Sequence, residues 1–127
     1  MTNYIINGGK KLKGEITVNS SKNSAVAILL ASLLNDGPTV IINLPKIEEV
    51  FRIIEILESI GVKTAWRGKA LKVSPPEKLK LEKLDIEAAL KTRIMILLIG
   101  ILIHKFKKFS LPFSGGCKLG KRTLTPH

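Results

Sequence analysis

Two stretches of the chain share one pattern, and this repetition constrains the fold more than any other feature. "KNSAVAILLASLLNDGPTVIINLP" (22–45) and "TRIMILLIGILIHKFKKFSLP" (92–112) each have the pattern of a buried helix, a short turn, a strand and a Leu-Pro pair. The two Leu-Pro pairs are 67 residues apart. Such spacing indicates a structural unit used more than once, here of order β-α-β-α-β-β. Because stacked units bury their cores against one another, one unit and a fraction of the next predict an incomplete architecture.

The first half of the unit is predicted from local patterns. "YIING" (4–8) and "GEITVNS" (14–20) have the β-branched content and the alternation of strands. A helix should follow, with Ser20 or Ser21 as its N-cap and an almost continuous apolar body. "GPTVIINLP" (37–45) then predicts a strand that a Gly-Pro turn opens.

The second half of the unit continues with an amphipathic helix in "KIEEVFRIIEILESIG" (46–61), for which Gly61 is the natural C-terminal cap. "VKTAWRGKALKVSPP" (62–76) predicts a β-hairpin with its turn at Arg-Gly-Lys. The next unit is predicted to begin with a long helix over residues 85–106 and to continue with a strand over 107–112.

The formal net charge of +11, from 21 Lys and Arg against 10 Asp and Glu, favours an anionic partner. Phosphate, a nucleotide, nucleic acid or a membrane surface would each suit it. An alternative is that the lysines only solvate the surface, because they are spread along the whole chain. With one Trp, one Tyr and no nucleic-acid motif, nucleic acid is not the partner we expect.

The single cysteine cannot form an internal disulfide, which favours a reducing compartment. The start, "MTNYIINGGKKLKG", lacks the regions of a signal peptide. The longest apolar run, residues 94–103, has about half of the roughly 20 residues that span a bilayer. We therefore expect a cytoplasmic protein with no membrane partner.

The loop "SGGCKLGKR" (114–122) is the first candidate site. Its glycine pair allows close approach of the backbone to a ligand, and Lys118, Lys121 and Arg122 would favour the thiolate of Cys117 and hold an anion beside it. The thiol could serve as a proton donor or a nucleophile, or it could be an unreactive loop cysteine. One Cys and two separated His make no recognisable metal site.

Lys22 and Asn23 are the second candidates, because they fall at the start of the first buried helix, where free N–H groups and the helix dipole attract anions. Arg93 occupies the equivalent place before the second buried helix. The alternative is a solvated first-turn lysine, with Asn23 as another possible cap.

Taken together, "NGGKKLKGEITVNSSKNSAVAILLASLL", "VIINLPKIEEV", "LESIGVK" and "SLPFSGGCKLGKR" resemble the enolpyruvyl transferases, in particular those that act on UDP-N-acetylglucosamine. The resemblance runs in collinear order from Tyr4 to His127. The cysteine loop separates this group from the related shikimate-pathway enzymes, which lack it.

The resemblance implies an α/β (α+β) fold of repeated β-α-β-α-β-β units, the inside-out α/β barrel of the enolpyruvyl transferases, here incomplete. Full-length members have two such domains with the active site between them. Residues 1–20 would then be opening strands that belong to the second domain. Residues 21–127 would be part of the first domain, with one full repeat and the start of the next.

The resemblance also implies a reaction, the transfer of the enolpyruvyl group of phosphoenolpyruvate to the 3-hydroxyl of UDP-N-acetylglucosamine, the first committed step of peptidoglycan synthesis. In that family the loop cysteine is the general acid and the target of fosfomycin, which assigns this role to Cys117. Lys22 and Arg122, and Arg93 within a less typical "KTRIMILL", would bind phosphoenolpyruvate, and Asn23 the nucleotide sugar. No cofactor is implied.

The sequence also departs from the family pattern. Phe113 and Ser114 are extra residues before the glycine pair, and Thr123 and Thr125 replace a proline and an aspartate that contact the uridine diphosphate part. Missing repeats would have to come from another chain or from self-association. The alternative function is a non-catalytic remnant or regulatory protein that binds a nucleotide sugar or phosphate.

Overall fold

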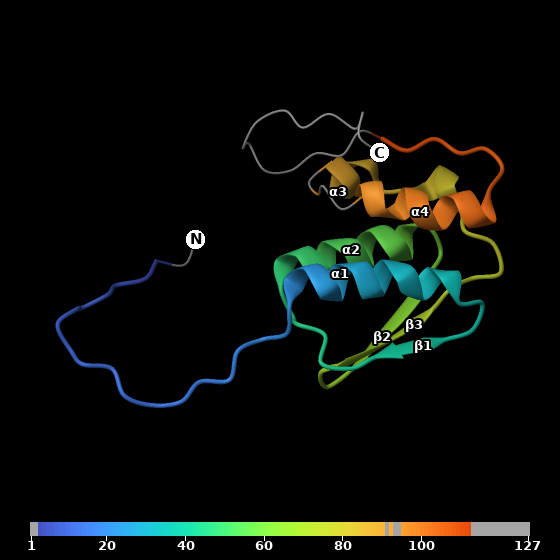
Figure 1. Ribbon diagram of the computed structural model, residues 1–127. Coiled ribbons are helices and arrows are strands. Elements are labelled where there is room, and N and C mark those ends of the chain that lie inside the picture. The colour runs from blue at the N-terminus through green and yellow to red at the C-terminus, as the bar shows by residue number, and fades with distance from the viewer. Residues whose placement is uncertain (1–2, 91, 93–94, 113–127) are drawn as a thin grey trace.

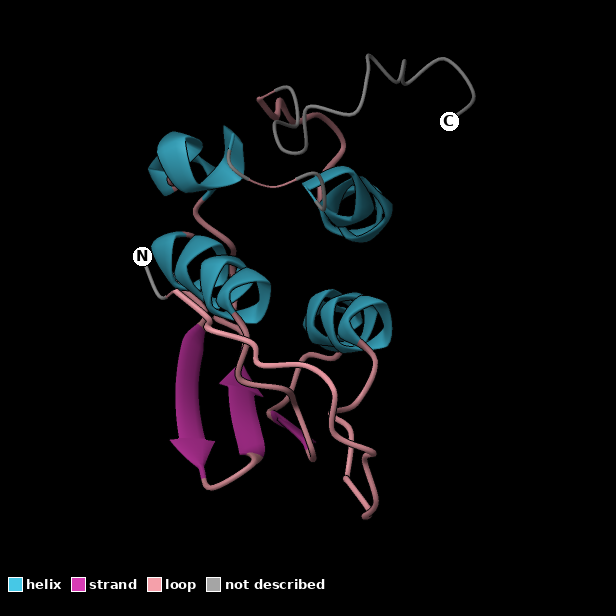
Figure 2. Cartoon of the chain, turned by 90° about the vertical axis from the view of Figure 1, so that its left-hand side faces the viewer, coloured by secondary structure: helices cyan, strands magenta, loops and turns pink. Residues whose placement is uncertain are grey.

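The protein is described by a computed structural model that covers residues 3–90, 92 and 95–112 (Figure 1). The body has three layers, which Figure 2 shows in cross-section. A three-stranded sheet forms the first layer, helices α1 (Lys22–Ala31) and α2 (Glu48–Ser59) form the second, and α3 (Ile86–Leu90) and α4 (Met95–Lys105) form the third. The middle layer is therefore covered on both sides.

Helix α1 begins at Ser21, whose Oγ accepts a hydrogen bond from the Ser24 N–H at 3.4 Å. This confirms the predicted cap. A short 3-10 turn, η1 (Ser32–Leu34), continues the helix. Its apolar body suits a middle layer, and Leu29 and Leu33 have no exposed surface.

The sheet has the order β1-β3-β2 with all neighbours antiparallel. Its strands are β1 (Thr39–Ile41), β2 (Lys63–Arg67) and β3 (Ala70–Ser74). The predicted hairpin is confirmed: Arg67 pairs with Ala70 across a two-residue loop, in which Gly68 has a φ of 59°. A hairpin turn this tight needs a positive φ, which glycine adopts without strain.

Helix α2 ends as the sequence predicts, at a glycine. Gly61 has a φ of 100° and donates its N–H to the Glu58 carbonyl at 3.0 Å. The next N–H, of Val62, bonds back to the Leu57 carbonyl at 3.0 Å. This pair of bonds is the Schellman motif. The apolar contact that accompanies it is between Leu57 and Val62, which are both buried.

The core lies between the sheet and the two helical layers. Its fully buried large side chains come from every layer, which fixes the layers against one another. They are Leu29, Leu33, Ile53, Ile56, Leu57, Ile60, Leu71, Leu98 and Leu102, with the valines Val26, Val50 and Val73.

The strands predicted at 4–8 and 14–20 are not present. Residues 3–20 form an extended arm without helix or strand, which leaves the body in Figure 1. Its apolar side chains are exposed, as in Tyr4 at 86% and Val18 at 78%. The prediction was wrong because alternation marks a strand that can pair, and the arm has no neighbouring strand in the described part of the chain.

The long helix predicted over 85–106 is wrong in one respect, because it is two helices, α3 and α4. Asp85 caps α3: its Oδ1 accepts a hydrogen bond from the Ala88 N–H at 2.9 Å. Thr92 is buried and not helical, and its N–H bonds to the Ala89 carbonyl three residues back, which tightens the end of α3. The short turn η2 (Leu81–Lys83) precedes both.

The strand predicted over 107–112 is also not formed, since residues 106–112 contain no strand. Among the described residues no strand pairs with them, because the layer in which they lie is built from helices α3 and α4. The fold is therefore a mixed helix and sheet structure with a small antiparallel sheet. Among the described residues, no helix has the length and apolar content needed to cross a membrane.

Candidate anion-binding site at the start of α1

The structure describes two of the five predicted site residues, Lys22 and Asn23. Both lie in the first turn of α1, as the sequence predicts, and both are exposed. Arg93, Cys117 and Arg122 lie outside the described residues, so their roles stay predictions.

Lys22 has a partner that the sequence did not predict. Its Nζ lies 2.6 Å from Oε2 of Glu49, in the first turn of α2, and the two side chains are 53% and 29% exposed. Figure 1 shows why they meet: α1 and α2 run side by side and begin at the same end of the body. The preference of acidic residues for a helix start was the available signal, but the sequence could not indicate which helices are neighbours.

The start of α1 and the half-exposed ammonium of Lys22 favour a small anion, because the helix dipole and the ammonium act in the same direction, whereas Glu48 and Glu49 already occupy the start of α2. Asn23 adds amide donor and acceptor groups beside them. The first turn of α1 contains no acidic residue. Among the described residues, no cluster of His, Cys, Asp and Glu could hold a metal ion. These features make this end of the body the candidate anion-binding site, and the pairing of Lys22 with Glu49 opposes that role.

An open hollow of about 480 Å³ lies next to the start of α1. It is lined by the end of the arm, by the loop after β1 and by the tip of the hairpin. Two cations, Lys46 and Lys69, line it, and Lys46 Nζ lies 5.0 Å from the ring centroid of Trp66. Neither lysine was predicted as a site residue, because only the fold brings the two loops together.

The hollow is braced by backbone geometry. Ser20 Oγ donates to the Asn43 carbonyl at 2.6 Å, which ties the end of the arm to the loop after β1. Asn43 has a φ of 55°, in the left-handed region that asparagine tolerates better than most residues. The Leu44 N–H donates to the Lys69 carbonyl at 3.1 Å and joins this loop to the hairpin tip.

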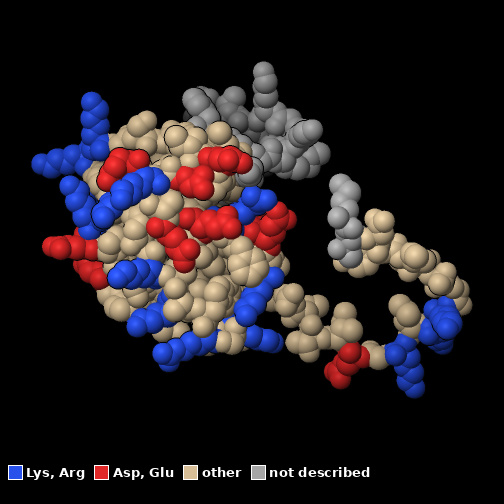
Figure 3. Space-filling model, turned by 180° about the vertical axis from the view of Figure 1, so that it is seen from behind, with Lys and Arg blue, Asp and Glu red and all other residues tan. Residues whose placement is uncertain are grey.

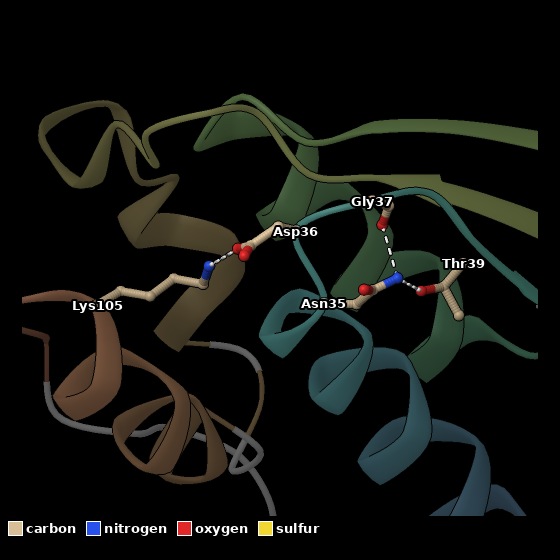
Figure 4. A network of polar contacts seen from close by, with 5 residues as sticks. All are labelled: Asn35, Asp36, Gly37, Thr39 and Lys105. Carbon is tan, nitrogen blue, oxygen red and sulfur yellow. Dashed lines mark hydrogen bonds and ion pairs between the residues drawn. The ribbon is translucent and has the colours of Figure 1, made fainter.

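The opposite end of α1 is anchored to α4. Lys105 Nζ lies 3.2 Å from Oδ1 of Asp36, and the Asn35 side-chain amide donates to the Gly37 carbonyl and the Thr39 hydroxyl (Figure 4). These contacts fix the turn between α1 and β1. They lie at the far end of the helix from Lys22, so they support α1 without reaching the candidate site.

The sheet and helix α2 carry opposite charge. The segments that build the sheet and its loops, residues 37–47 and 62–76, hold five cations and no acidic residue. Helix α2 holds four glutamates and one arginine. Figure 3 shows Lys and Arg along the lower edge of the body, where the sheet lies, and Asp and Glu together with further Lys and Arg above it. The five cations are Lys46, Lys63, Arg67, Lys69 and Lys72.

Comparisons of the sequence with known proteins show the family of the chain. Residues 6–127 match the model of the EPSP synthase (3-phosphoshikimate 1-carboxyvinyltransferase) family. The chain is 39% identical over 127 residues to UDP-N-acetylglucosamine 1-carboxyvinyltransferase 2 of Caldanaerobacter subterraneus subsp. tengcongensis and to UDP-N-acetylglucosamine 1-carboxyvinyltransferase of Endomicrobium trichonymphae. It is 36% identical over 129 residues to the protein of that name from Borreliella burgdorferi.

All of this chain is covered in these three comparisons, but it spans only 30% of the length of each relative. The resemblance found in the sequence motifs is therefore confirmed along the whole chain. The match over residues 6–127 includes the start of α1 and the cysteine loop. The chain belongs to the EPSP synthase family of enolpyruvyl transferases.

Proposed function

We propose that this chain is the cysteine-bearing part of an enzyme that transfers the enolpyruvyl group of phosphoenolpyruvate to the 3-hydroxyl of UDP-N-acetylglucosamine. The observation that supports this most strongly is the 36–39% identity, over the full chain, to relatives named UDP-N-acetylglucosamine 1-carboxyvinyltransferase. The reaction would serve peptidoglycan synthesis, and the protein would act in the cytoplasm.

In this proposal Cys117 gives a proton to the methylene of phosphoenolpyruvate, and the sugar hydroxyl adds to the neighbouring carbon as it loses its own proton. The adduct then loses phosphate and a proton of the new methyl group, which restores the double bond, and the thiolate regains a proton. Lys22, Arg93 and Arg122 hold the phosphate and carboxylate, and Asn23 binds the nucleotide sugar. The half-exposed ammonium of Lys22 at a helix start supports its part of this assignment. No metal or other cofactor takes part.

We further propose that the three-layered body is part of an inside-out α/β barrel, built from β-α-β-α-β-β units of which residues 21–127 supply one and the start of another. Residues 1–20 would pair with strands of the second domain. The exposed apolar side chains of the arm, such as Ile6 and Ile16, support this, because no strand in the described part of the chain pairs with the arm.

In this proposal the further repeats of the barrel carry other acid and base groups of the site, and turnover without them should be very low. Each acid or base that an active site loses lowers the rate by about 10²–10⁴-fold. The exposed apolar residues on the outer side of α4, among them Leu97 and Ile103, would be covered in the complete barrel.

A second candidate function is a non-catalytic protein that binds a nucleotide sugar or phosphate. Thr123 and Thr125 favour it, because they stand where the family has a proline and an aspartate against the uridine diphosphate. Cys117 favours the enzyme, because a binding protein has no use for a thiol in that loop.

The test is the intact mass of the purified chain after incubation with fosfomycin, with and without UDP-N-acetylglucosamine. We expect one adduct, formed faster with the nucleotide sugar and lost in the Cys117→Ser variant. A chain that reacts with iodoacetamide but never with fosfomycin would contradict the enzyme proposal, because the thiol would then lack its site. Nucleotide-sugar binding without any adduct would favour the second candidate.

A further inference from the structure

The ion pair at the start of α1 has a consequence for how the site is filled. We propose that Glu49 is a built-in counter-anion, which occupies the anion-binding position of Lys22 while the site is empty and which the incoming phosphate or carboxylate must displace. This rests on the proposed function only in taking Lys22 as an anion-binding residue.

The geometry supports an exchange of partners. Lys22 Nζ and Glu49 Oε2 are 2.6 Å apart, the distance at which a phosphate oxygen would also bind an ammonium. The lysine side chain is 53% exposed, so an anion from solvent can reach it without opening the body. Ion pairs this exposed are weak, so a small anion can displace the Glu49 carboxylate at little cost in free energy.

Glu49 can also release Lys22 without becoming an isolated buried charge. It lies in the first turn of α2, where the helix dipole stabilises a carboxylate whether or not it is paired, and its side chain keeps 29% of its exposure. A carboxylate left beside a bound anion would repel it. Glu49 therefore lowers the affinity of the empty site for every anion. A larger ligand that also contacts other residues of the site has additional binding energy to offset this loss, whereas a simple ion has none.

The neighbouring residue gives a matched control. Glu48 lies in the same turn and carries the same charge, but it pairs with Arg52 of its own helix. Neutralising Glu48 or Glu49 changes the net charge of the protein equally. Only the change at Glu49 leaves Lys22 without its carboxylate.

The experiment is a titration of the isotope-labelled full chain with inorganic phosphate at constant ionic strength, followed by NMR through the backbone amides of residues 22–24. Exposed ion pairs contribute about 0.2–1 kcal/mol, which corresponds to a gain of about 1.4- to 5-fold in affinity when the competing carboxylate is removed. We expect this gain in Glu49→Gln. Glu48→Gln should bind as the wild type does, and Glu49→Asp, which keeps the charge, should stay near it.

Two outcomes would overturn the inference. Equal affinities of Glu49→Gln and Glu48→Gln would show that only net charge matters, and weaker binding by Glu49→Gln would make Glu49 a support for Lys22 instead of its competitor. The variant Lys22→Met distinguishes a failure of the Glu49 proposal from a failure of the proposed role of Lys22. If phosphate binds equally well to Lys22→Met, the assignment of Lys22 as an anion-binding residue fails; if binding is lost there but not gained in Glu49→Gln, only the counter-anion fails.

Discussion

Gly61, at the end of α2, offers a direct measure of how much one backbone conformation contributes to this fold. Its φ of 100° allows the two hydrogen bonds that close the helix and lead the chain into β2. In Gly61→Ala the added Cβ would lie 3.5 Å from Cγ of Pro76, an ordinary contact. The substitution therefore tests the backbone conformation and not steric crowding.

The expected loss of stability in Gly61→Ala is therefore the cost of the backbone conformation alone. A side chain other than glycine in a sparsely populated region with positive φ costs about 1–3 kcal/mol. The smaller entropy of the unfolded alanine chain returns about 0.4–1 kcal/mol of this. We expect a net loss of about 1–2 kcal/mol, and Gly61→Asn should lose less, because asparagine tolerates this region better.

Gly100 is the matched control, because it lies in the interior of α4 with nothing within 4 Å of an added Cβ. Gly100→Ala should stabilise the chain by about 0.5–1 kcal/mol, since alanine is the better helix former. The assay is urea unfolding followed by circular dichroism, with midpoints compared at equal slope. If Gly61→Ala matches or exceeds the wild type in stability, the conformational argument is wrong.

Two further substitutions test the helices on either side of the core. Ser21→Ala removes the N-cap of α1 and should lower the free energy of unfolding by about 0.5–2 kcal/mol in the same assay. Ser21→Gly should lower it by only a few tenths of a kcal/mol. Equal losses in the two variants would mean that the Ser21 hydroxyl does not cap the helix. Leu102→Ala in α4 should cost about 2–5 kcal/mol, because Leu102 is fully buried, while Ile103→Ala, at 60% exposure, should cost far less; similar losses would contradict the packing of α4 on α1.

Local patterns in the sequence were sufficient for the parts of the fold that local chemistry determines. The serine cap of α1, the glycine end of α2 and the Gly68 turn of the hairpin each follow from one residue and its immediate neighbours. The predictions failed at residues 4–8, 14–20 and 107–112, where a strand requires a partner far away in the sequence. Alternation indicates which side of a strand faces a core, but not whether a neighbouring strand exists.

In the candidate site, too, the sequence predicted what local signals determine and missed what depends on contacts between distant segments. Lys22 could be placed at a helix start from the sequence, because the apolar body of α1 and its cap are local signals. Its pairing with Glu49, and the approach of Lys46 to Lys69 around one hollow, depend on two helices and two loops meeting in space. Cys117, Arg93 and Arg122 lie outside the described residues and remain predictions from the sequence.

The arm has a practical consequence for work with this protein. Lys10, Lys11 and Lys13 lie on extended, exposed backbone, which is the form in which a protease binds its substrate. Trypsin should therefore cut there before it cuts the lysines of the helices and strands. The buried core begins only at Ala25, so the trimmed body should keep its fold. A brief digest would thus separate the part of the chain that folds by itself from the part that exposes apolar side chains to solvent.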